Sequence, residues 1–79
     1  MERILSDYGT QEKRRAVLLQ LEISAREEQE AINAYRRRAD YARIGFPATS
    51  IMLNHIREEE EEHLKEIRRE IERLNKQGG

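Results

Sequence analysis

Proline occurs once in this 79-residue chain, within the segment Ile44-Gly45-Phe46-Pro47. Gly45 suits the left-handed backbone that ends a helix, and Pro47 cannot continue a helix but can begin one. Nothing breaks a helix before or after this segment over long stretches. We therefore expect a single all-α domain, an antiparallel hairpin of two helices over residues 11–43 and 49–75, joined by a turn at residues 44–48.

The helix ends have weaker markers. Thr10 follows Gly9 and is suited to cap a helix that begins near Gln11, while Thr49 or Ser50 is expected to cap the second helix. Residues 1–9 are predicted to form a short leading turn with its own apolar contacts, Ile4, Leu5 and Tyr8.

Composition excludes several classes of function. Charged residues make up 39% of the chain but the net charge is −1, so the short basic runs at residues 14–15 and 36–38 are expected to be solvated surface, with no nucleic-acid partner. No apolar stretch approaches the roughly 20 residues of a membrane span, and no signal peptide is recognisable. The absence of cysteine excludes disulfides, thiolate metal sites and a cysteine nucleophile. We expect a cytoplasmic protein without a membrane partner.

Apolar residues recur at spacings of three and four along both predicted helices, as in helix bundles. We call these two rows the seams. The first seam is Leu18, Leu21, Ala25, Glu28, Ile32, Tyr35, Ala39 and Ala42, widened by Val17. The second is Leu53, Ile56, Glu60, His63, Ile67, Ile71 and Leu74, widened by Leu64. Outside the seams, charges recur at helix-supporting spacings, as in Glu22 with Arg26, Glu61 with Lys65, and Glu72 with Lys76.

Three polar residues interrupt the seams, namely Glu28, Glu60 and His63. Burying a carboxylate without a partner costs several kcal/mol or more. The seams as drawn contain no lysine or arginine, so a metal cation is the expected compensation. Counted from Gly45, Glu28 lies seventeen residues before the turn, Glu60 fifteen after it and His63 eighteen after it. In an antiparallel hairpin these positions lie at nearly the same level.

Their spacing also suits metal ligation. Residues 60–63 form Glu-x-x-His, which places a carboxylate and an imidazole one helical turn apart. Di-iron carboxylate bundles take one Glu from each of two helices and one Glu-x-x-His from each of two others. One hairpin supplies half of that set, so we expect a homodimer that completes a four-helix bundle around a di-iron centre. Iron is the leading metal, ahead of manganese and zinc.

Each of these residues has a simpler explanation when taken alone. A Glu-rich helix contains Glu-x-x-His by chance, and the run 58–62 is usually a solvated face, which we expect for Glu58 and Glu61. A single seam histidine is more often a core residue than a ligand. The coincidence of three such residues at one level favours the metal site.

The segments EEQEAINAY (27–35) and NHIREEEEEHL (54–64) resemble the encapsulated ferritins, two-helix members of the ferritin-like superfamily. The resemblance implies that Glu28, Glu60 and His63 are the catalytic metal ligands, with Glu60 bridging two irons. It also implies a metal-uptake site at Glu27 and Glu30, a secondary surface site at His55, Glu59 and Glu62, and an aromatic neighbour at Tyr35. The simpler interpretation of Tyr35 is a bundle-core residue, and that of His55 a surface histidine.

The resemblance implies a ferroxidase, an oxidoreductase that converts Fe(II) to Fe(III) for iron storage and detoxification. It further implies a ring of dimers inside an encapsulin nanocompartment. Cargo loading in that family uses a C-terminal peptide, whereas this sequence ends in Asn75-Lys76-Gln77-Gly78-Gly79. The chain is therefore expected to be truncated, to be loaded or fused differently, or to work without a shell.

Two other functions remain open at this stage. One is a different di-metal enzyme on the same bundle, such as a rubrerythrin-like peroxidase or a manganese protein. Rubrerythrin itself has an additional cysteine-ligated iron, which this chain cannot form. The other is a helical-hairpin adaptor that binds no metal.

Overall fold

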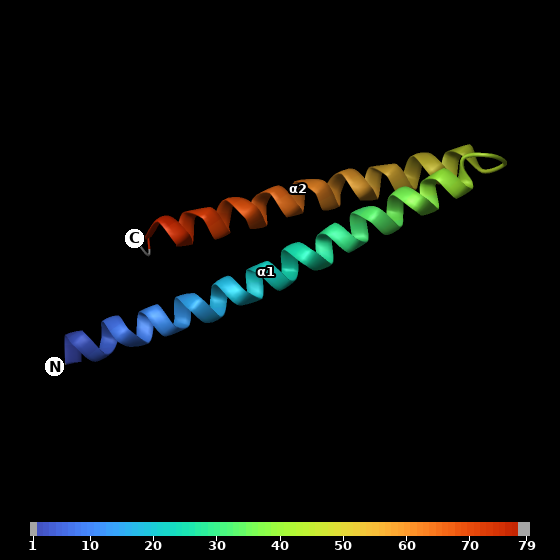
Figure 1. Cartoon of the computed structure of the whole chain (residues 1–79). Coiled ribbons are helices and arrows are strands. Elements are labelled where there is room, and N and C mark those ends of the chain that lie inside the picture. The colour runs from blue at the N-terminus through green and yellow to red at the C-terminus, as the bar shows by residue number, and fades with distance from the viewer. Residues whose placement is uncertain (1, 78–79) are drawn as a thin grey trace.

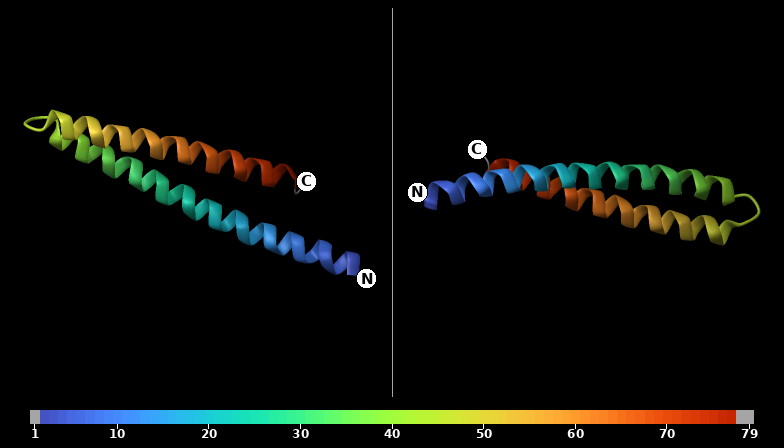
Figure 2. Two further views of the ribbon diagram at one scale, coloured as in Figure 1. Left: turned by 180° about the vertical axis from the view of Figure 1, so that it is seen from behind. Right: turned by 90° about the horizontal axis from the view of Figure 1, so that it is seen from below.

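A computed structural model describes residues 2–77, with side chains described from residue 9 onwards. It consists of two antiparallel helices, α1 (Glu2–Ala42) and α2 (Pro47–Gln77) (Figure 1). The predicted all-α hairpin is confirmed. The molecule is a rod of 67 × 15 × 15 Å (Figure 2). Its radius of gyration is 18.5 Å, against about 12 Å expected for a compact domain of this length.

The turn is built as its sequence predicts, but with shifted bounds. Gly45 has a φ of 95°, and the Phe46 amide donates to the Ala42 carbonyl at 3.0 Å, which closes α1. Pro47 is the first residue of α2, and the Ser50 amide donates back to the Phe46 carbonyl at 3.0 Å. The turn therefore occupies residues 43–46 rather than 44–48, and Thr49 and Ser50 already lie within the helix.

Ser50 does not cap α2, contrary to the prediction. Its side chain is 7% exposed, and its hydroxyl donates to the Ala39 carbonyl of α1 at 2.7 Å. Proline at the first helical position has no amide to be capped, and its fixed φ already suits the helix. The hydroxyl is thus free to join the two helices.

The predicted start of the first helix was wrong, because α1 runs through Gly9 and Thr10 from Glu2. An exposed glycine in a helix costs only about 1 kcal/mol relative to alanine. Adding residues to an existing helix is much easier than starting one, so one glycine need not end it. Residues 2–9 are therefore helical rather than a leading turn. The predicted contacts of Ile4, Leu5 and Tyr8 lie outside the described side chains.

The two seams meet as predicted, but few of their side chains are buried. Among the described apolar residues only Ile32, Ala39 and Leu64 are buried, at 5% exposure or less. The other seam residues are half-buried, apart from the exposed His63 and Val17. Figure 1 shows the helices diverging away from the turn, with α1 extending past the end of α2.

Ion pairs within each helix cover much of the outer surface. Lys76 lies 3.3 Å from Glu72 as predicted, and Arg73 lies 2.6 Å from Glu70. The expected Glu61–Lys65 pair is replaced, because Lys65 lies 3.3 Å from Glu62. In the described part of the chain, neither helix contains a segment apolar enough to cross a membrane.

Candidate metal centre

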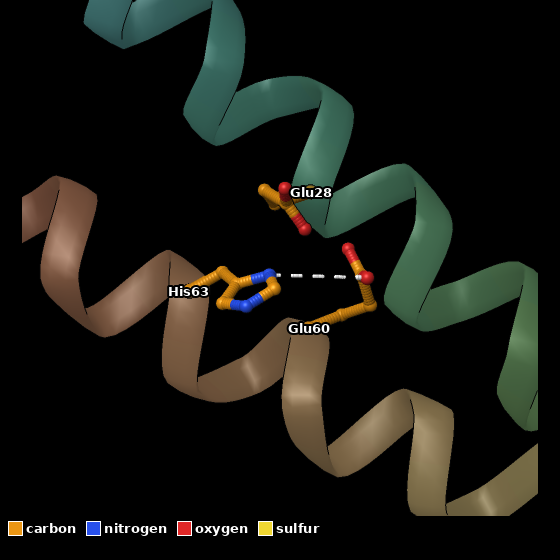
Figure 3. A group of neighbouring side chains, drawn as sticks. All are labelled: Glu28, Glu60 and His63. Carbon is orange, nitrogen blue, oxygen red and sulfur yellow. Dashed lines mark ion pairs between the residues drawn. The ribbon is translucent and has the colours of Figure 1, made fainter.

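The structure brings Glu28, Glu60 and His63 together about midway along α2. Glu28 projects from α1, and Glu60 and His63 project from successive turns of α2 (Figure 3). One ligand atom from each residue lies within 4.8 Å of the others. His63 Nδ1 is 3.9 Å from Glu60 Oε1. The hairpin register that the sequence predicted for these three residues is therefore the register that forms.

Burial differs among the three side chains. The Glu60 side chain is 23% exposed and the His63 side chain is 54% exposed. Glu28 is half-buried, and its Oε2 atom is buried without a hydrogen-bond partner among the described residues. A buried, unpaired carboxylate oxygen is costly, so a native one calls for a partner that supplies positive charge or a proton.

The surroundings of Glu28 disfavour the charged form of its carboxyl group. The pKa of Glu28 is raised above its ordinary value, first because a proton can be shared in a hydrogen bond with Glu60. Burial and the negative charge of Glu60 raise this pKa further, and His63 opposes the shift. These are the effects expected of two carboxyl groups sharing one site.

Residues 2–77 match the ferritin-like domain family. The chain belongs to this family. No curated protein and no solved structure matches the chain. A ferritin-like bundle carries its metal ligands on the inward faces of its helices. In this hairpin Glu28 and Glu60 are half-buried, whereas His63 is exposed.

The side chains of this ferritin-like protein fit a transition-metal cation. Two carboxylates and one imidazole are donors that first-row metals such as iron accept. Metal–oxygen and metal–nitrogen bonds of about 2.1 Å hold ligand atoms roughly 4 Å apart or less. A spread of 4.8 Å closes to that range by small side-chain rotations. The unpaired Glu28 Oε2 is the atom that such a cation would satisfy.

The other residues assigned by resemblance do not join this cluster. Within the described residues, Glu28, Glu60 and His63 form the only such group of possible ligands. Glu27 and Glu30 are exposed beside it on α1, and the secondary-site residues His55, Glu59 and Glu62 are exposed on α2. Tyr35 is half-buried, with the Arg38 guanidinium 5.5 Å from its ring centroid. Metal binding at the uptake and secondary positions stays a prediction.

Sequence reasoning missed an arginine inside the hairpin. The Arg57 side chain is only 20% exposed, so a part-buried cation lies beside the second seam, although neither seam as defined contains a lysine or arginine. Arg57 pairs with Glu61, which also lies 3.6 Å from Arg36 of α1, so Glu61 is not simply solvated. The sequence contains a pattern that indicates this burial. Ser50, Arg57 and Leu64 recur every seven residues and therefore share one face of α2.

Proposed function

We propose that this ferritin-like protein is a ferroxidase, which oxidises Fe(II) with dioxygen at a site completed by a second copy of the chain. The observation that carries the proposal is the cluster of Glu28, Glu60 and His63 with its unpaired carboxylate oxygen. The resemblance of residues 27–35 and 54–64 to encapsulated ferritins supports that subtype, with iron storage as its purpose and an encapsulin shell as a further partner.

The number of candidate ligands in one chain supports the involvement of a second copy. One hairpin offers two carboxylates and one imidazole, whereas di-iron carboxylate bundles use four Glu and two His. A two-fold axis beside the cluster doubles the set without any further residue. Glu28 and His63 are suited to be terminal ligands, and Glu60 is suited to bridge two irons.

The surface of the hairpin also supports pairing. Its accessible area is 6530 Å², about 1500 Å² above the roughly 5000 Å² of a compact protein of this mass. A standard interface buries about 800 Å² on each partner. The half-buried seam residues on both sides of the cluster, among them Leu53, Ile56, Ile67 and Tyr35, offer apolar area for such an interface. Self-association would bury the surface that this small core leaves open.

Each side chain has a definite task in this reaction. Two Fe(II) ions are the substrate, and their oxidation to Fe(III) supplies two electrons, which with two protons from solvent reduce one dioxygen to hydrogen peroxide. Glu28 and Glu60 supply negative charge that favours Fe(III) over Fe(II), because a higher cation charge gains more from fixed carboxylates. His63 supplies a neutral nitrogen donor, and its exposed position leaves it accessible to incoming metal. Metal binding competes with protonation of Glu28, because carboxylates bind metal in their deprotonated form.

The test is Glu60→Ala, with Glu66→Ala as the matched control on the exposed side of the same helix. We expect Glu60→Ala to lose rapid Fe(II) oxidation, measured by the rise of Fe(III) absorbance in the near ultraviolet after mixing with air. Sedimentation with and without Fe(II) should show metal-dependent dimerisation for the wild type and for Glu66→Ala. Comparing dioxygen with hydrogen peroxide as the oxidant separates this function from a peroxidase.

Normal oxidation by Glu60→Ala would contradict the assignment. Equal losses in both variants would mean that overall negative charge matters and that the cluster does not. An unchanged oligomer and melting temperature on iron addition would favour the metal-free adaptor instead.

A further inference from the structure

A hollow lies between the helices, on a flank separate from the cluster of Glu28, Glu60 and His63. Its floor is formed by Ile32 and Leu64, the two most deeply buried large side chains, and its volume is about 250 Å³. Glu61 and Leu64 line it and directly follow Glu60 and His63. One residue is about 100° of helix rotation, so these neighbours point to a different flank. None of the three candidate metal ligands lines this hollow.

The rim of the hollow is strongly cationic. Arg36, Lys65 and Arg68 line it, against the single carboxylate of Glu61. Arg36 lies 3.6 Å from Glu61, and the side chain of Arg36 is 56% exposed. Within residues 9–77, Lys65 pairs with Glu62 alone, at 3.3 Å, with both side chains more than 60% exposed. Such exposed pairs contribute little free energy, so both cations are available to another anion.

Arg68 is the cation with no competing carboxylate. No ion pair or hydrogen bond of its side chain occurs within residues 9–77. Glu61 is already shared between Arg57 and Arg36, so it does not neutralise Arg68. The guanidinium presents several fixed donors, which match the oxygens of phosphate or carboxylate groups in pairs.

We propose that this hollow binds a small oxyanion with two or more negative charges, held mainly by Arg68 and supported by Arg36 and Lys65. Inorganic phosphate and a short polycarboxylate share this chemistry, and a volume of about 250 Å³ accommodates either one. The apolar floor of Ile32 and Leu64 lowers the local dielectric constant on that side, which strengthens the attraction between a bound anion and the cationic rim.

This site does not depend on the proposed ferroxidase function. It uses none of the metal ligands and requires no metal, so it can be measured on the metal-free chain. A failure here leaves the ferroxidase proposal untouched, and the reverse also holds.

The test is titration of the full chain, freed of metal on a chelating resin, with phosphate and separately with citrate. Ionic strength is held constant with sodium chloride, and amide chemical shifts are recorded by NMR. We expect saturable shifts centred on residues 64–68 and on Ile32. Arg68→Gln should weaken the affinity about tenfold, which corresponds to one lost charge-assisted hydrogen bond. The matched control is Arg69→Gln, which removes the same charge from an exposed neighbour outside the hollow.

Saturable binding that Arg68→Gln weakens and Arg69→Gln leaves unchanged supports the site, and the tighter of the two probes identifies the ligand. Shifts that do not saturate overturn the proposal. Equal weakening by both variants also overturns it, because the effect is then general attraction to a basic surface.

Discussion

Among the polar side chains that are buried or half-buried in the hairpin, Ser50 lies near the turn and Glu28 lies nearer the middle. The Ser50 hydroxyl donates to the Ala39 carbonyl at 2.7 Å, so the hairpin itself provides its partner. Glu28 Oε2 is buried without a hydrogen-bond partner among the described residues. Sharing of a proton with Glu60, burial and the Glu60 charge all raise the pKa of Glu28. The Ser50 hydroxyl therefore has a partner within the chain, whereas one carboxylate oxygen of Glu28 has none among the described residues.

This difference distinguishes Ser50, which stabilises the hairpin, from Glu28, which is a candidate metal ligand. A buried polar group that the fold satisfies adds stability and specificity, whereas one left unsatisfied lowers stability. The region around Ser50 and Gly45 is complete in one chain. The region around Glu28 lacks positive charge, which a metal cation would supply. The predictions that follow test this contrast, beginning with the largest effect.

Glu28→Gln should act in opposite directions on metal binding and on the stability of the metal-free chain. We expect metal affinity to fall by more than about 100-fold, above the loss typical of altering an outer partner of a ligand. The metal-free variant should be more stable than the wild type at neutral pH, because the disfavoured charge is gone. Metal titration and urea unfolding of both forms measure the two effects, with the exposed Glu22→Gln as the control.

The same variant tests a pH dependence. The pKa of Glu28 is raised in the folded chain above its ordinary value of 4.5, so the folded state binds the proton more tightly than the unfolded state. Its contribution to stability is complete below pH 4.5 and is lost as the pH rises through the raised pKa. Metal-free wild type should therefore lose stability over this range, and Glu28→Gln should lose less. Parallel pH profiles would refute the assigned cause.

Gly45→Ala should produce the next largest effect. It changes the region around Ser50 and Gly45, which is complete in one chain. An added methyl group meets no atom within 4 Å, so the cost is the left-handed backbone alone, at φ 95°. That strain amounts to about 1–2 kcal/mol of unfolding free energy. Gly9→Ala is the matched control, because Gly9 is helical and equally open, and alanine there should stabilise by about 0.5–1 kcal/mol. Thermal unfolding of the metal-free chains distinguishes the two, and a loss of stability in Gly9→Ala would contradict the continuous helix.

Ser50→Ala should have the smallest effect, a loss of about 1 kcal/mol, because one hydrogen bond to a buried carbonyl is removed. Iron oxidation per folded molecule should stay at the wild-type rate, since Ser50 is remote from the cluster. Chemical denaturation and the oxidation assay measure these two quantities. A slowed oxidation in folded Ser50→Ala would mean that the turn sets the geometry of the ligands.

Much of the fold could be predicted from particular residues. Gly45 and Pro47 specify where the chain reverses, because one allows the left-handed backbone and the other cannot continue a helix. The 3.6-residue period then orients the seams, and equal distances from the turn place Glu28 level with Glu60 and His63. Helix starts were less predictable, because the cost of Gly9 is small against the rest of α1.

The sequence by itself determined the hairpin, its register and the three residues that meet, because helical period and turn position depend only on local backbone chemistry. The tertiary structure decided which polar groups found partners. It turned the Ser50 hydroxyl to Ala39, buried Arg57 against Glu61 and left Glu28 Oε2 unpaired. Those outcomes depend on where the side chains of the two helices lie relative to one another and on how water is excluded between them. The spacing of residues along the sequence does not specify either.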